Sequence, residues 1–296
     1  MGSRKQGARN GKQEARSKKR GAGSEEQGAG INVAPAQGVF ILASCYEAKQ
    51  EVTEMQEYVI YPLVIGANET DQGIMTYLRG YGKRIWIPIY AFLIKGAEEV
   101  ILVDTGLEQF VVPEHVGREH GLKIQEFEEA LEDHGLRPED IDLIIHTHLH
   151  NDHCENDQKC QQAKIVVQKA EYDFFLNPHP IDHRYYPDLL DGLHVELVEG
   201  DVSLRDGIDL IFTPGHTPGG QSVAVHTSGG KAIITGFCCN ALNFPANAPI
   251  VASGVHTDAI AAFESALKIS KMADILIPLH DISIGKLGII PNVRTK

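Results

Sequence analysis

A histidine-rich stretch, "IIHTHLHNDHCEN" at residues 144–156, sets the strongest limit on how this chain can fold and function. It holds four histidines and an aspartate within eight positions, directly after an apolar run. Imidazoles two residues apart on an extended segment share one face, so their nitrogen lone pairs can converge on one metal ion. A polar loop without a metal is the alternative, but the buried strand before it would aim the cluster at one place. The stretch therefore predicts a metal site at the end of a strand.

One register within this stretch supplies a useful set of ligands. His148 and His150 share a face, and the chain then turns to add the Asp152 carboxylate and the His153 imidazole. His146 lies earlier in the strand, and we expect it to be a hydrogen-bonded partner or a core residue instead. The predicted ligands of the stretch are therefore His148, His150, Asp152 and His153.

Two further histidines occupy similar positions elsewhere in the chain. His216 sits in a tight Pro-Gly turn in "TPGHTPGGQS", where glycines let the backbone approach closely. His280 ends an apolar run in "ILIPLHD". Each alone could be a core or loop residue, but both are expected at strand ends, on the same side as His148. We therefore predict that both contribute to the metal site.

Short apolar runs separated by turns follow from about residue 38, beginning with "GVFILASC", "IWIPIYAFLI" and "EEVILVDTG". Residues 123–135 space apolar side chains at helical intervals and stop at Gly135, which predicts an amphipathic helix. A second helix is predicted over 258–271 with Thr257 as its cap. "AKIVVQKAEYDFF" predicts a strand and then a helix, and further strands are expected at "DIDLIIHT", "VELVEG", "IDLIFTPG", "QSVAVHT", "KAIITG" and "ADILIPLH". Two runs of strands, each followed by helical material, predict an α/β sandwich with helices outside two central sheets.

The first thirty residues differ from the rest in composition. They contain eight Lys or Arg, three acids and no aromatic residue, too little apolar surface to offset the entropy of ordering. We predict a disordered basic tail at residues 1–30 and one domain at residues 31–296. The tail could contact nucleic acid or an anionic surface, or serve only as a solubilising extension. The remaining chain carries a net charge of about −18, which argues against nucleic-acid binding by the domain.

The sequence offers no sign of secretion or of a membrane span. The tail lacks the apolar stretch of a secretory signal, and no segment has about eighteen consecutive apolar residues. The five cysteines have neither a disulfide-scaffold spacing nor a CxxC pair, which fits a reducing compartment and disfavours a thiolate zinc finger. We expect a soluble cytoplasmic protein that acts on a small molecule. Its oligomeric state stays open, a homodimer included.

Four motifs resemble those of the metallo-β-lactamase superfamily: "ILVDTG", "THLHNDHCEN", "TPGHTPGGQS" and "ILIPLHD", in this order. The resemblance covers about residues 38–290. The stretch "VELVEGDVSLRDGIDLIFTPGHTPGGQS", with its spacing to "KAIITG" and the ending "HD", looks most like the N-acyl homoserine lactonase branch. The resemblance implies a single-domain αββα sandwich and a two-metal site, usually of zinc.

The resemblance also implies roles for individual residues. The first metal would be held by His148, His150 and His216, and the second by Asp152, His153 and His280. Asp104 of "VDTG" would orient a ligand and close a turn, although a plain turn-forming aspartate would also stand after a strand.

The sequence departs from the family pattern after "KAIITG". Phe237 occupies the position of the usual carboxylate that bridges both metals, and a phenyl ring cannot ligate. Cys238 or Cys239 could ligate as a soft thiolate, hydroxide alone could bridge, or one site could stay empty. Adjacent cysteines in a strand are otherwise ordinary core residues. Asn240 stands where the lactonase branch usually has a tyrosine that helps with the substrate carbonyl.

The implied reaction is hydrolysis of a lactone or a related ester, with an acyl homoserine lactone-like substrate. Metal-bound hydroxide would attack the carbonyl, and Asp152 would orient the nucleophile and pass a proton to the leaving group. An aromatic loop with Phe174, Tyr185 and Tyr186 could line an acyl pocket or form a surface lid.

Other interpretations of the same residues stay open. Thioester hydrolysis would use the same centre. A single iron held by His148, His150 and a carboxylate would support oxygen chemistry instead. A non-catalytic member would have kept the fold and lost the metal bridge. Two zinc ions are the expected cofactor, with one metal, iron or manganese as alternatives.

Overall fold

The computed structural model describes residues 55–292, which belong to one compact unit. The tail predicted at residues 1–30, the domain start at residue 31 and the strand predicted at "GVFILASC" lie outside the described residues. Within residues 55–292, no helix combines the length and the apolar character that crossing a membrane requires.

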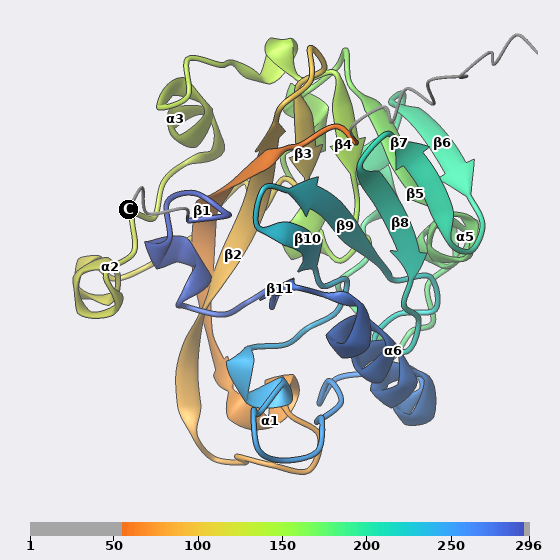
Figure 1. The fold of residues 1–296 in the computed structure, drawn as a ribbon. Coiled ribbons are helices and arrows are strands. Elements are labelled where there is room, and N and C mark those ends of the chain that lie inside the picture. The colour runs from red at the N-terminus through yellow and green to blue at the C-terminus, as the bar shows by residue number, and fades with distance from the viewer. Residues whose placement is uncertain (1–54, 293–296) are drawn as a thin grey trace, which may run out of the picture. The chain divides into compact units, whose positions relative to one another are not determined.

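Two β-sheets form the centre of this unit (Figure 1). The first has six strands in sequence order, with β1 and β2 antiparallel and β3 to β6 mutually parallel. Its strands are β1 (Val59–Asp71), β2 (Arg84–Lys95), β3 (Ile101–Val103), β4 (Leu143–Ile145), β5 (Lys164–Gln168) and β6 (His194–Val198). The second has the order β11-β10-β9-β8-β7. Its strands are β7 (Val202–Arg205), β8 (Ile208–Phe212), β9 (Gln221–Thr227), β10 (Gly230–Ile234) and β11 (Ile275–Ile277).

The main hydrophobic core lies between the two sheets. Side chains alternate across a strand, so one strand can serve two cores. In β2, Phe92 and Ile94 join the core shared with β8, β9 and β10, whereas Ala91 and Leu93 join a second core on the outer face. Strands buried on both faces read as continuous apolar runs, and this explains "IWIPIYAFLI".

Helices cover the outer faces of both sheets (Figure 1). α3 and α5 pack on the six-stranded sheet, and α6 covers the five-stranded sheet through Ala266 and Ile269. The helices are α1 (Gln72–Met75), α2 (Glu114–His120), α3 (Phe127–Glu132), α4 (Asn151–Cys154), α5 (Lys169–Leu176) and α6 (Ala259–Met272). The predicted αββα sandwich is confirmed.

Two helix predictions need correction at their ends. The helix predicted over 123–135 is only α3, because Ile124 pairs with Val64 of β1 and keeps the preceding residues extended. At α6 the predicted cap, Thr257, is wrong by one residue. The Asp258 side chain accepts hydrogen bonds from the amides of Ile260 and Ala261, whereas Thr257 donates to the Gly215 carbonyl.

β1 is the longest strand within residues 55–292 and was not predicted from the sequence. A register shift between Val64 and Ala67 interrupts its pairing with β2. The strand then continues through the polar segment "NETD", whose side chains are largely outside the core. Because the apolar pattern ends at this irregularity, the second half of β1 does not look like a strand in the sequence.

Candidate metal centre

The histidine-rich stretch begins where β4 ends. β4 is fully buried and pairs in parallel with β3 and β5, so the chain leaves the sheet at the carboxyl edge of its parallel strands. His148 and His150 follow in an extended segment, and α4 then carries Asp152 and His153 in its first turns. This strand, loop and short helix bring the four predicted residues to one place.

His216 and His280 reach the same place from the second sheet. His216 follows β8, and the backbone there needs a glycine. Gly215 has φ +124°, and a Cβ on it would lie 2.1 Å from the Ala262 amide nitrogen of α6. His280 follows β11, and its amide donates to the Cys239 carbonyl. The close packing of α6 on the turn thus fixes the position of His216.

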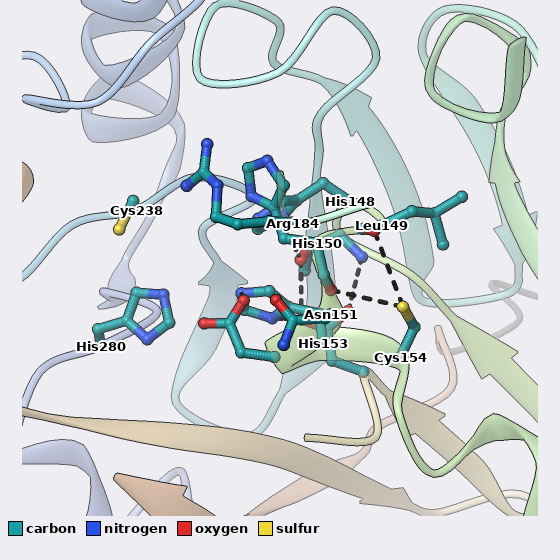
Figure 2. A network of polar contacts seen from close by, with 12 residues as sticks. His148, Leu149, His150, Asn151, His153, Cys154, Arg184, Cys238 and His280 are labelled. Atoms are coloured by element: carbon teal, nitrogen blue, oxygen red, sulfur yellow. Dashed lines mark hydrogen bonds and ion pairs between the residues drawn. The ribbon is translucent and has the colours of Figure 1, made fainter. Parts of the chain in front are cut away.

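Six side chains form two groups of three. Within each group, the candidate ligand atoms lie within 4.8 Å of one another. The groups are His148, His150 and His216, and Asp152, His153 and His280. The ring centroid of His148 lies 4.2 Å from that of His153, so the groups are adjacent. Figure 2 shows the imidazoles gathered together, with His280 on the side opposite Cys154. The structure therefore brings together all six residues named from the sequence.

In the first group, hydrogen bonds occupy one nitrogen of each imidazole and leave the other for a ligand. Nδ1 of His148 lies 3.0 Å from the Thr147 hydroxyl, and its buried Nε2 has no hydrogen-bond partner. Nδ1 of His216 bonds to the Val255 carbonyl at 2.8 Å. His150 is held through the opposite atom, because its Nε2 lies 3.1 Å from Asp182, which leaves Nδ1. Such contacts fix the tautomer and orientation of a metal-binding histidine.

The second group is held in the same way. Nδ1 of His153 lies 2.9 Å from Oδ2 of Asp104, and Nδ1 of His280 lies 3.0 Å from the Pro88 carbonyl. Asp104 also accepts the amide and hydroxyl of Thr147, each at 2.8 Å. The Asp104 backbone has φ +59°, which places this residue in a tight turn. Its carboxylate contacts both Thr147 and His153. Asp104 thus orients His153 and closes the turn after β3.

The charges of the site follow from burial and from neighbours. Burial and nearby imidazoles lower the pKa of His148 and of His216 well below the usual value. Burial also lowers the pKa of His280, to about 4. Burial opposes ionisation of Asp152, but His153 and His280 lower its pKa overall. Burial opposes the charged form of His153, but Asp152 and Asp104 raise its pKa overall. The site therefore offers a carboxylate and three imidazoles that favour the neutral form, the forms that bind metals, and His153 would release a proton to a metal.

These residues suit a metal such as zinc. The unpaired Nε2 of buried His148 is costly unless something fills its lone pair. Five imidazole nitrogens and one carboxylate oxygen are a donor set that zinc accepts readily.

In the segment after β10, three consecutive side chains point in different directions, which the sequence alone does not determine. Phe237 and Cys239 point into the core beneath α6. Cys238 points the other way and lines the cavity beside the histidines, with Sγ 3.8 Å from Sδ of Met75. Among residues 55–292, neither candidate ligand group includes a cysteine. Asn240 accepts from the Leu242 amide and donates to Gln72 within the protein.

A cavity of about 350 Å³ opens over the two groups, next to an apolar groove of about 820 Å³. Ile74 and His216 lie on the wall that both share. Phe174 lines the groove. Tyr185 instead lies buried with its hydroxyl 2.9 Å from Glu171, and Tyr186 is half exposed at another surface. The predicted aromatic loop thus contributes one ring to the groove.

Sequence analysis did not identify Asp182 or Arg184 as site residues. Both lie in the irregular loop between α5 and β6, where no periodic pattern marks a side chain. Arg184 donates to Asp182 through Nε at 2.8 Å and through Nη2 at 2.7 Å. Burial opposes ionisation of Asp182, but His150 and Arg184 lower its pKa well below the usual range. Only the short spacing "DHR" hints at this pair.

An αββα sandwich with a histidine-rich centre at one edge of its sheets defines a class of candidate metalloproteins. Residues 84–236, more than half of the chain, match the family model described as the metallo-beta-lactamase superfamily. The chain belongs to this superfamily, and the resemblance noted in the motifs is confirmed.

Similar proteins include lactonases. The chain is 31% identical over 171 residues to an N-acyl homoserine lactonase of Bacillus thuringiensis, and the alignment covers 52% of this chain and 65% of the relative. The chain thus matches slightly less than two thirds of that relative's length. AttM, an N-acyl homoserine lactonase of Rhizobium radiobacter, is 27% identical over 53% of this chain and 66% of its own length.

A solved structure extends the similarity. An N-acyl homoserine lactone hydrolase, described with N-hexanoyl-L-homoserine at its catalytic metal centre, superimposes with a TM-score of 0.63 at 26% identity. The superposition covers 78% of this chain and 96% of that structure.

Proposed function

We propose that this chain is a metal-dependent hydrolase that opens a lactone or cleaves a related ester, with acyl homoserine lactone-like substrates. The observation that carries the proposal is the pair of adjacent ligand groups beneath a cavity. The similar proteins support it, since they are named lactonases and one is described with an opened-lactone product at its metal centre.

Two zinc ions are the proposed cofactor. His148, His150 and His216 would hold one ion, and Asp152, His153 and His280 the other. When bound, such metals lower the pKa of water from 15.7 to about 7 and polarise a carbonyl oxygen. Phe237 faces away from the site and Cys238 lies outside both groups, so neither supplies the usual bridging ligand in this account.

Asp152 is the proposed catalytic residue. Its Oδ1 lies 3.6 Å from Nε2 of His153, and its side chain is 19% exposed, so it can touch a molecule in the cavity. A carboxylate can accept a proton from the attacking water and return it to the leaving alkoxide oxygen.

The groove next to the cavity fits an acyl chain. Ile74, Phe174 and Val255 give the groove apolar walls. An acyl chain bound there would place the bond to be cleaved beside His216. Burial of the chain would exclude water from one side of the reacting carbonyl.

The proposed setting is the cytoplasm, with a small-molecule substrate. Cys154, Cys160, Cys238 and Cys239 are free and buried, which fits a reducing compartment. The negative net charge of the chain argues against a nucleic-acid substrate.

Metal analysis combined with a substrate screen tests the proposal. Purified protein should contain zinc and hydrolyse one or more acyl homoserine lactones, with activity lost on chelation and restored by zinc. Asp152→Ala should reduce kcat by at least about 100-fold, the usual scale for a general acid-base residue.

Three results would point elsewhere. An Asp152→Ala protein as active as the wild type would rule out this role for Asp152. One iron per chain, with oxygen uptake on a thiol substrate, would identify an oxygenase instead. Flat panels of lactones, esters and thioesters after metal restoration would favour a non-catalytic protein.

A further inference from the structure

Arg184 stands where the metal cavity meets the apolar groove. Its side chain lines both, together with Thr70, Ile74 and His216. Arg184 is the one Lys or Arg among the described residues that line either space. Figure 2 shows its guanidinium beside the histidine cluster, on the side where Cys238 lies. Any molecule that spans the cavity and the groove must pass this positive charge.

The ion pair with Asp182 fixes the direction of the guanidinium. Nε and Nη2 both donate to the Asp182 carboxylate, which also accepts from the Arg184 amide and contacts His150. A bidentate pair of this kind holds the guanidinium plane in one orientation. Nη1 has no hydrogen-bond partner within residues 55–292, and the Arg184 side chain is 37% exposed. Two donor hydrogens on Nη1 are therefore left for a bound molecule.

Asn240 does not supply such a donor to the cavity. Asn240 stands where related lactonases are expected to carry a tyrosine, but its side chain is engaged with Leu242 and Gln72 and does not line the cavity. The histidines of the cavity are committed as candidate ligands. A guanidinium binds both a carbonyl oxygen that gains negative charge and a carboxylate.

We propose that Arg184 binds the substrate through Nη1, by donating a hydrogen bond to the carbonyl oxygen of the scissile ester and then to the carboxylate of the opened product. This assignment rests on the proposed function. Asp182 acts as a positioning residue, because it holds the guanidinium on one side and His150 on the other. The proposal makes the opened acid a specific ligand of this chain.

The experiment compares four metal-loaded proteins, each with all 296 residues of the chain: wild type, Arg184→Gln, Arg184→Lys and Arg205→Gln. Arg205 is a matched control, since it makes the same two-point pair with Glu99 through Nε and Nη2, each at 2.8 Å, but lies in β7 and does not line the site. Metal content is measured first. Hydrolysis of N-hexanoyl-L-homoserine lactone gives kcat and KM, and calorimetry gives the Kd of N-hexanoyl-L-homoserine and of its uncharged amide.

Arg184→Gln should lower kcat by about 100-fold, the scale for removing one donor from a developing oxyanion. It should raise the Kd of the acid by about 10-fold or more, and that of the amide by clearly less, because only the acid carries a charge. Arg184→Lys should fall between Gln and wild type, since it keeps the charge and loses the fork. Arg205→Gln should match the wild type, and all four proteins should hold the same metal.

The proposal is overturned if Arg184→Gln and Arg184→Lys behave as Arg205→Gln does. It is also overturned if both Arg184 variants lose metal or weaken the acid and the amide equally, because Arg184 would then serve only the structure. If the wild type and both Arg184 variants open the lactone equally fast, the role of Arg184 is wrong but the proposed function stands. A wild type that binds the acid through Arg184 but opens no lactone would contradict the hydrolase and keep Arg184 as a carboxylate-binding residue.

Discussion

Nε2 of His146 lies 2.7 Å from Oδ2 of Asp157, and both side chains are fully buried. Nδ1 of the same imidazole lies 3.4 Å from Oδ1 of Asp104. His146 thus stands between two carboxylates, one of which also holds His153. His146, which we did not predict as a ligand, therefore contacts the carboxylate that orients His153.

Replacing His146 with glutamine should destabilise the metal-free protein. The change removes the cation between two buried carboxylates, and breaking a buried charge pair in this way costs about 3–5 kcal/mol. Urea unfolding of the metal-free variant measures the loss in the free energy of unfolding. His194→Gln, at an exposed position in β6, is the control and should stay close to wild type. A His146→Gln protein as stable as the control would show that the imidazole carries no charge.

The stability of the metal-free protein should fall as the pH rises from about 6.5 toward 10. Burial disfavours the charged form of His146, but the charges of Asp157 and Asp104 raise its pKa to about 10. The folded state then binds a proton that an unfolded histidine, with a pKa of about 6.5, has released. The contribution is therefore complete below about pH 6.5 and lost as the pH passes 10. Unfolding curves of wild type and His146→Gln over this range should converge, and a constant difference would contradict the account.

Glu171→Gln should loosen the first ligand group. The buried Glu171 carboxylate accepts the amides of Leu149 and Gly219, each at 3.0 Å, and the Tyr185 hydroxyl at 2.9 Å. It therefore links the loop of His148 to the turn of His216. An amide keeps one acceptor and adds a donor, so we expect a loss of about 1–3 kcal/mol. Competition with a chelator should show weaker metal retention than in Glu132→Gln, an exposed control, and equal retention would argue against this link.

Cys238 should not coordinate a bound metal. Its sulfur packs against Met75 and stands outside both ligand groups of the described chain. Cobalt-substituted wild type and Cys238→Ser should have the same near-ultraviolet spectrum and the same metal content. A sulfur-to-cobalt charge-transfer band that disappears in Cys238→Ser would identify a thiolate ligand and overturn this assignment.

The sequence predicted those elements whose apolar patterns are local. β2 and β5 are continuous apolar runs because both faces are buried, and α6 has regular helical spacing. β1 escaped prediction because its pairing is interrupted near Gly66 and its second half is polar. The α3 helix came out too long, since the pairing of Ile124 with β1 is a tertiary contact that no local pattern encodes.

The site divides in the same way. His148, His150, Asp152 and His153 lie within six residues, so local spacing suffices to group them. Asp182 and Arg184 act through hydrogen bonds across the fold, from a loop without a repeating pattern, and only the structure places them beside His150. The side chains of "FCC" could be assigned to the core or to the cavity only once the backbone direction was known.

The most direct measurement of the central claim is the rate of N-hexanoyl-L-homoserine lactone opening as zinc is titrated into metal-free protein. The account predicts negligible ring opening without metal, a rate that rises until two zinc ions are bound per chain, and a rate at least about 100-fold lower throughout in Asp152→Ala. Ring opening by the metal-free protein at the full rate, or none at any zinc content, would contradict it.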